Sequence, residues 1–193
     1  MAVFETLFPT SLYRASFRPM GSLEKTCLSI AAEDKAGQRW SRDHGYGGYT
    51  SYVSLDDLTR RASIFADLEK TLDGHVKTFA RGLRFERKRL KLDSIWINVM
   101  EKGAVHAAHI HPHSAVSGTY YVTAPPGSGA IRFEDPRLGL MMAAPTRKAG
   151  HFVDVAPKPG LLLLWESWLR HGVEVSRSQG AKAKRISISF NYA

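Results

Sequence analysis

The segment Leu92–Met100, LDSIWINVM, marks a change in the hydrophobic pattern of this chain from a helical period to a period of two. Alternate side chains of a strand point to opposite faces. One set of alternate positions is apolar throughout and the other is mixed: Ile95, Ile97 and Val99 against Trp96, Asn98 and Met100. The segment therefore predicts a strand with one face in an apolar core.

Shorter segments of the same kind follow downstream, and turns that contain glycine or proline separate them. We expect strands at 117–123, 130–133, 161–165 and 185–192. Short strands separated by such turns are typical of a sandwich or jelly roll. The predicted fold class is therefore mainly β with flanking helices.

The residues before Leu92 favour helices instead. Apolar side chains recur at steps of one, three or four residues through 62–83, which predicts an amphipathic helix on the outer face of a sheet. A second helix is expected at 22–36, with Gly37 after its end. The segment Trp40–Val53 is rich in glycine and aromatic residues, and we expect a loop there that either packs on the surface or forms the rim of a site.

The length of 193 residues fits one domain, with residues 1–90 as a helical support region and 91–193 as the β core. With 44% hydrophobic and 23% charged residues, the composition excludes dominant disorder. Cys27 is the sole cysteine, so the chain cannot form an internal disulfide, and a reducing, cytoplasmic location is expected. We expect no membrane segment, because no apolar run of about 20 residues occurs. We expect no signal peptide, because the N-terminus lacks a basic region followed by an apolar core.

The charge balance is basic, with 27 basic against 18 acidic residues and a net charge of +9. Basic residues cluster at 84–91 and 177–185. Such surfaces attract polyanions, but no zinc-finger, RNA-recognition or helix-turn-helix pattern accompanies these clusters. We therefore interpret them as solvated surface and do not expect nucleic acid as a partner.

Four of the eight histidines fall within eight residues: His106, His109, His111 and His113. On an extended strand His109 and His111 share a face, whereas His106 points the other way. Two imidazoles at this spacing, about 6–7 Å apart along a strand, can converge on one metal ion. The alternative is a histidine-rich turn in solvent.

A third metal ligand would have to come from elsewhere in the chain, and His171 is the best candidate. It follows the apolar segment 161–165 and opens a further predicted strand. Imidazole suits iron, zinc, copper and nickel, and three protein ligands leave positions open, as a catalytic metal requires. The predicted metal ligands are therefore His109, His111 and His171.

The last strand has one polar and one apolar face: Arg185, Ser187, Ser189 and Asn191 alternate with Ile186, Ile188, Phe190 and Tyr192. If the apolar face packs on helices, Arg185 points inward, where a charge without a partner is costly. A bound carboxylate ligand would pair with this guanidinium. The alternative is a structural ion pair with Asp135, Asp154 or Glu174.

Together these motifs resemble the Fe(II)- and 2-oxoglutarate-dependent oxygenases, and more narrowly a microbial branch of the 2OG-Fe(II) oxygenases. They occur in the expected order: Gly47–Tyr52, Trp96–Asn98, His109–Pro112, Ser117–Val122, Phe133–Arg137, Ser167–His171 and Arg185–Asn191. The similarity covers the chain from about residue 45 onward. Two features depart from the family pattern: His111 stands where the family carries a carboxylate, and the spacing from His171 to Arg185 is longer than is common.

The resemblance implies a double-stranded β-helix with iron at its mouth. It implies that His109 and His171 are Fe(II) ligands, and that His111 completes a three-histidine set. It also implies that Arg185 and Ser187 hold 2-oxoglutarate, the cosubstrate, by its distal carboxylate.

Two further residues, Asn98 and Tyr120, are expected to face the barrel and to hydrogen-bond the cosubstrate. The predicted activity is oxygenation: 2-oxoglutarate is decarboxylated to succinate, and a small-molecule or peptide substrate that the sequence does not identify is hydroxylated. The alternatives are a cupin-like three-histidine dioxygenase without 2-oxoglutarate and a non-catalytic metal- or ligand-binding β-barrel. Arg185 and Ser187 argue against the first alternative, because that chemistry needs no inward carboxylate clamp. A homodimer is compatible with the sequence.

Overall fold

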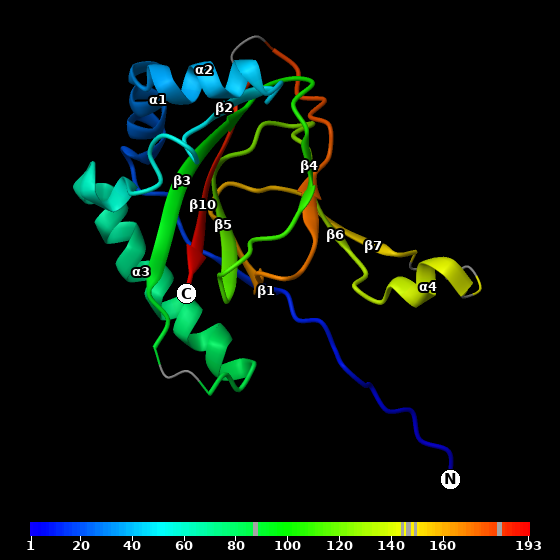
Figure 1. Cartoon of the computed structure of the whole chain (residues 1–193). Coiled ribbons are helices and arrows are strands. Elements are labelled where there is room, and N and C mark those ends of the chain that lie inside the picture. The colour runs from blue at the N-terminus through cyan, green and yellow to red at the C-terminus, as the bar shows by residue number, and fades with distance from the viewer. Residues whose placement is uncertain (87–88, 144, 146–147, 149, 181–182) are drawn as a thin grey trace.

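The computed structural model describes residues 1–86, 89–143, 145, 148, 150–180 and 183–193. Two antiparallel sheets form the centre of the molecule, and helices cover the outside of the larger one (Figure 1). In spatial order the larger sheet contains β1 (Tyr13–Ser16), β8 (Leu161–Glu166), β5 (Val116–Thr123), β10 (Arg185–Tyr192), β3 (Leu92–Met100) and β2 (Gly48–Thr50). The smaller sheet contains β4 (His106–His109), β9 (His171–Val173), β6 (Ile131–Glu134) and β7 (Phe152–Val155).

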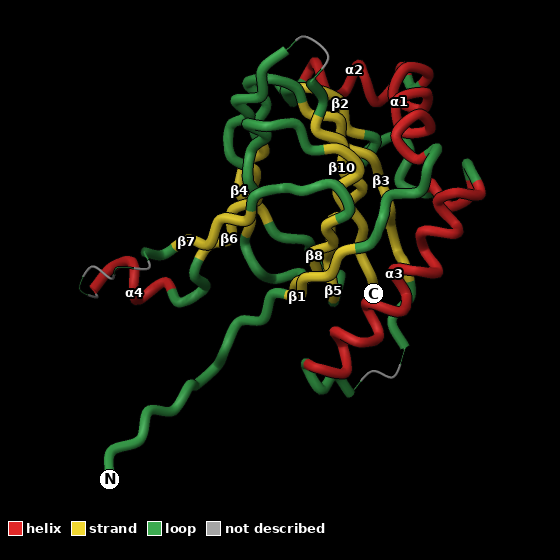
Figure 2. Tube along the Cα trace, turned by 180° about the vertical axis from the view of Figure 1, so that it is seen from behind, coloured by secondary structure: helices red, strands yellow, loops and turns green. Residues whose placement is uncertain are grey.

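The helices are α1 (Leu23–Glu33), α2 (Lys35–Asp43), α3 (Ser63–Gly82) and α4 (Leu138–Ala143), with a 3₁₀ turn at Leu58–Arg60. Figure 2 shows α1, α2 and α3 on one side of the molecule, whereas α4 and the β6–β7 end of the smaller sheet extend away on the other. This arrangement confirms the predicted class, mainly β with flanking helices in a jelly-roll form. No helix in the described part of the chain has the length and apolar character needed to cross a membrane.

The main core lies between α3 and the outer face of the larger sheet. The α3 side chains in this core are Phe65, Leu68, Leu72, Val76 and Phe79, and all five are buried. They join the apolar faces of β3 and β10, including Ile97 and Ile188, in one cluster. Because full burial of such a side chain stabilises the fold by about 1.5–3 kcal/mol, this layer holds the sheet in place and leaves its other face for a site.

The strongly periodic segments agree closely with the sequence predictions. The strands β3 and β10 have the expected bounds, β5 and β8 differ by one residue at one end, and β6 is shifted by one residue at both ends. The helix predicted at 62–83 is α3. The support region expected at 1–90 also supplies β1 and β2 to the larger sheet. Residues 87–88 and 181–182, which belong to the two basic clusters, lie outside the described residues.

The segment after residue 33 differs from the prediction. Gly37 does not end the first helix but lies in the first turn of α2, and Asp34 separates the two helices. The Asp34 carboxylate accepts a hydrogen bond from the Gly37 backbone N–H at 2.9 Å, which caps α2. A Cβ at Gly37 would meet the side chains of Asp34, Ser54 and Tyr49. This glycine is therefore required for close packing, and the loop predicted from Trp40 begins as helix.

Candidate active site

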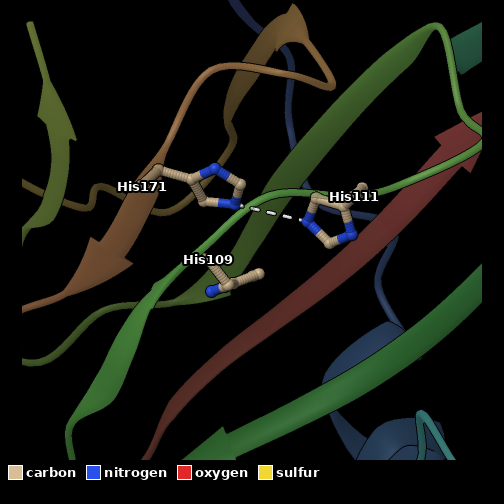
Figure 3. A group of neighbouring side chains, drawn as sticks. All are labelled: His109, His111 and His171. Atoms are coloured by element: carbon tan, nitrogen blue, oxygen red, sulfur yellow. Dashed lines mark hydrogen bonds between the residues drawn. The ribbon is translucent and has the colours of Figure 1, made fainter. Parts of the chain in front are cut away.

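Three histidines converge where the smaller sheet meets the loop that follows β4 (Figure 3). His109 ends β4 and is paired across the ladder with His171, which opens β9. His111 lies beyond the end of β4, and its backbone N–H donates to the Ser167 carbonyl at 3.0 Å. One nitrogen from each ring lies within 4.8 Å of the others. The structure thus brings together the three residues that the sequence singled out as a metal triad.

Hydrogen bonds to the backbone orient two of these rings. Nδ1 of His109 lies 2.8 Å from the Ala107 carbonyl oxygen, and Nδ1 of His171 lies 2.8 Å from that of Leu169. A carbonyl oxygen only accepts, so we infer that both Nδ1 atoms carry the proton and that both Nε2 atoms present a lone pair. This arrangement is the usual one for histidines that bind a metal.

The spacing of the free nitrogens also fits one ion. Nε2 of His111 lies 3.3 Å from Nε2 of His171. Two nitrogens bound tetrahedrally to one ion at about 2.0–2.1 Å would lie about 3.3–3.4 Å apart. The His111–His171 pair therefore has the spacing of two ligands of one ion, and all three imidazoles are donors of the type that first-row metals such as iron bind.

Burial keeps these imidazoles neutral. Burial, and next the charge of neighbouring His109, lower the pKa of His111 to about 4 and that of His171 to about 3. Burial also lowers the pKa of His109. Because metal binding requires unprotonated imidazole, all three rings are ready to bind an ion at neutral pH.

A buried arginine lies at the other end of the same region. Arg185 opens β10 and is 3% exposed. Its Nη1 donates to the sulfur of Met100 at 3.1 Å and to Ser187 Oγ at 3.4 Å, and its guanidinium lies 4.9 Å from the centre of the Tyr121 ring. Its Nε has no partner among the described residues. These weak contacts leave the charge available for an anion.

The acidic residues considered as structural partners of Arg185 pair elsewhere. Asp135 binds Arg137, with nitrogen and oxygen 2.7 Å apart. Asp154 and Glu174 both pair with Arg132, at 2.7 and 2.9 Å. Across the part of the chain that the structure describes, Arg185 forms no salt bridge, so the structural ion-pair alternative is wrong.

A small cavity joins the metal triad to Arg185. Residues of both sheets line it, among them Trp96, Asn98, Trp165, Ser187 and Ser189. Its volume is about 40 Å³, which is room for a few waters. A ligand of the size of 2-oxoglutarate therefore requires the lining side chains to move apart.

Asn98 lies on the cavity side of β3, opposite Ser187, as the alternation of β3 predicts. Its amide oxygen accepts hydrogen bonds from Tyr46 at 3.1 Å and Thr50 at 2.9 Å, and its amide nitrogen donates to Ser189 at 3.1 Å. The amide is thus held by protein groups, and only its second N–H can serve a ligand.

Tyr120 does not face the barrel, so the expectation for this residue is wrong. It lies in the helix-side core, where its ring stacks on Phe17 and its hydroxyl donates to the Phe17 carbonyl at 3.2 Å. Tyr121, its neighbour on β5, lies on the Arg185 side, and its buried hydroxyl has no partner among the described residues. The signal in the sequence was strand parity, since Tyr121 shares a face with the cavity-lining Thr119.

His106 also departs from the prediction, because it lines the same cavity instead of pointing away. Its strand is irregular: His106 pairs with Val173 and His109 with His171, so three steps in β4 match two in β9. The extra residue returns His106 to the cavity face. Trp165, which the sequence analysis did not single out, packs against His171 with ring centres 4.6 Å apart.

The fold and the site define a class of protein: a double-stranded β-helix with a histidine triad at one end of its cavity and a buried arginine at the other. The chain belongs to the family described as "Putative 2OG-Fe(II) oxygenase", which it matches over residues 94–191. The family predicted from the sequence is therefore confirmed. A comparison with curated proteins finds no match.

Solved structures share the fold. A prolyl-4-hydroxylase from Pseudomonas putida has a TM-score of 0.62 at 14% identity, over 95% of this chain and 92% of the other. HygX from Streptomyces hygroscopicus, solved with nickel, 2-oxoglutarate and hygromycin B, has a TM-score of 0.59 at 15% identity, over 95% and 83%. A 2OG-Fe(II) oxygenase family oxidoreductase from Burkholderia pseudomallei has a TM-score of 0.50 at 16% identity; 68% of this chain is covered, and the chain spans 56% of that protein.

Proposed function

We propose that this protein is an oxygenase that couples the oxidative decarboxylation of 2-oxoglutarate to the hydroxylation of a substrate. In this proposal His109, His111 and His171 hold Fe(II), and Arg185 with Ser187 binds the distal carboxylate of 2-oxoglutarate. The observation that carries the proposal is a buried arginine without an acidic partner in the described chain, facing the same cavity as three converging imidazoles.

Each group of residues has a separate task. When bound, Fe(II) supplies the redox chemistry that converts 2-oxoglutarate and O₂ to succinate and CO₂ and oxidises the substrate. The neutral histidines hold the ion and leave positions open for other ligands. Arg185 orients the distal carboxylate, and the buried rings of Trp96 and Trp165 exclude water from the walls of the cavity.

The third histidine changes the charge of the site. Three neutral imidazoles leave both positive charges of the ion uncompensated, and Arg185 adds a third. The dianion 2-oxoglutarate brings two negative charges into a buried region where electrostatic interactions are strong. A three-histidine site therefore favours this dianion electrostatically more than a site with a carboxylate ligand would.

His111 also favours a second candidate, a three-histidine dioxygenase that needs no 2-oxoglutarate. Arg185 argues against it, because a substrate without a carboxylate would leave the buried guanidinium unpaired. For the substrate itself, a prolyl-4-hydroxylase and a protein solved with hygromycin B are both among the similar structures. Peptides and small molecules are therefore the substrate classes to screen.

The test is binding of 2-oxoglutarate to the anaerobic Fe(II) protein, followed by the metal-to-keto-acid charge-transfer band. We expect saturable binding, and release of succinate after O₂ is admitted. The matched control is Arg137→Ala, which removes an exposed arginine that is paired with Asp135. Iron binding with neither a charge-transfer band nor succinate would favour the second candidate, and failure to bind iron would contradict both.

A further inference from the structure

His106 is a cavity residue that the proposed chemistry does not yet use. The irregular pairing of β4 with β9 places it beside His109, and it lines the cavity together with Arg185 and Tyr46. Its ring lies outside the group of three histidines whose nitrogens converge. His106 is therefore in the cavity without being one of the three metal-site histidines.

Aromatic contacts hold the His106 ring on two sides. It stacks on His109 with ring centres 4.4 Å apart and an interplanar angle of 28°. The Tyr46 ring meets it edge-on at 5.4 Å and 82°, and Tyr46 is itself anchored by its hydrogen bond to Asn98. The imidazole is thus held in a defined orientation at the cavity wall.

The nitrogens of this ring are free for a ligand. His109 and His171 each use Nδ1 on a backbone carbonyl, whereas neither ring nitrogen of His106 has a hydrogen-bond partner within the described ranges. An imidazole offers at least one N–H donor. His106 lines the same cavity as the metal triad and Arg185, so a ligand that fills this cavity can reach its ring.

We propose that His106 is a further cosubstrate-binding residue, whose imidazole donates a hydrogen bond to a carboxylate oxygen of 2-oxoglutarate bound between the metal and Arg185. This inference rests on the proposed function. An imidazole at the cavity wall suits this role, because its ring N–H can donate to a carboxylate oxygen while the stacking on His109 and the edge-on contact with Tyr46 hold the ring in place.

The test compares His106→Phe, which keeps a ring for stacking but has no donor, with His106→Gln, which keeps an amide donor. Iron content is measured first, and then the dissociation constant for 2-oxoglutarate in the anaerobic Fe(II) protein. We expect full iron content in both variants. Binding of 2-oxoglutarate should weaken about 10- to 150-fold in His106→Phe, as for the loss of a hydrogen bond to a charged group. His106→Gln should recover part of this loss.

The control variant is His44→Phe, at an exposed histidine that follows α2, and it should bind like the wild type. If His106→Phe does not fold, His106→Leu carries the same expectation. Unchanged affinity in the variant without a donor overturns this inference alone. Loss of iron in that variant overturns it too, by making His106 part of the metal site. A wild-type protein that holds iron but does not bind 2-oxoglutarate contradicts the proposed function itself.

Discussion

The two faces of β10 differ in almost every property. The helix-side face carries Ile186, Ile188, Phe190 and Tyr192, all fully buried in the main core. The cavity-side face carries Arg185, Ser187 and Ser189, which line the region between Arg185 and the histidines. One strand therefore separates the part of the molecule that stabilises the fold from the part that can do chemistry.

The polar face also shows where a ligand is expected. Most of its groups are satisfied by neighbouring side chains, as in the bonds from Ser117 to Asn191 and from Asn191 to Ser94. The buried polar atoms that lack a partner within the described chain include Arg185 Nε, Tyr121 Oη and Trp165 Nε1. Arg185 and Trp165 line the cavity, and Tyr121 packs against Arg185. Because buried polar groups are nearly always hydrogen-bonded, this group of unpaired atoms indicates a binding site better than polarity alone does.

The largest expected effect is at the metal triad, where the cavity side can be changed without touching the main core under α3. His171→Ala should abolish stoichiometric iron binding, because it removes one of the three ligands. Loss of a residue that only hydrogen-bonds a ligand already lowers metal affinity about 10- to 100-fold. Metal analysis after anaerobic reconstitution measures this. His111→Asp is the matched control: it keeps a donor atom and should retain iron. Equal iron content in His171→Ala and the wild type would exclude the triad.

On the helix side, Phe79→Ala should lower the free energy of unfolding by about 3–5 kcal/mol, because it leaves a cavity in the main core. Phe79 is 5% exposed and packs against Tyr13 as well as the sheet. Chemical denaturation measures the loss. Below the unfolding transition, iron content and 2-oxoglutarate affinity should match the wild type. A specific loss of binding with unchanged stability would show that the two faces are not separate.

At the arginine end, Arg185→Ala should weaken 2-oxoglutarate binding by about 2–5 kcal/mol, as the truncation of one partner of a buried charge pair does. Arg185→Lys should recover only part of the affinity, because lysine keeps the charge but loses the bidentate fork. Iron content should be unchanged in both variants. The charge-transfer titration decides this, and wild-type affinity in Arg185→Ala would remove the main support for the oxygenase proposal.

The smallest effects should separate the two tyrosines on opposite faces of β5. Tyr120→Phe removes the hydrogen bond to the Phe17 carbonyl and should cost about 0.5–1.5 kcal/mol of stability with no change in 2-oxoglutarate binding. Tyr121→Phe removes a buried hydroxyl that has no partner among the described residues, so it should not lower stability. Parallel denaturation and binding curves test both. A stability loss in Tyr121→Phe larger than in Tyr120→Phe would contradict the assignment of faces.

Local periodicity was sufficient for much of this protein. The alternation in β3 and β10 and the helical stripe of α3 correctly predicted these elements and the face that each buries. The same reasoning placed His109 and His111 on one face and turned Arg185 inward, because strand parity follows from the backbone alone. His171 was chosen for its position after the apolar segment 161–165. The metal and cosubstrate roles of these residues remain predictions.

Tertiary structure decided what depends on a partner strand or on close packing. His106 enters the cavity because β4 gains one residue against β9. Such a bulge follows from the pairing of two strands far apart in the sequence and not from either sequence alone. Gly37 lies inside α2 because Asp34 caps that helix. The residue at this position has to be glycine, because Tyr49 and its neighbours pack too closely for a side chain. The sequence thus determined the faces of the regular elements, whereas contacts between distant segments decided which side chains share the cavity.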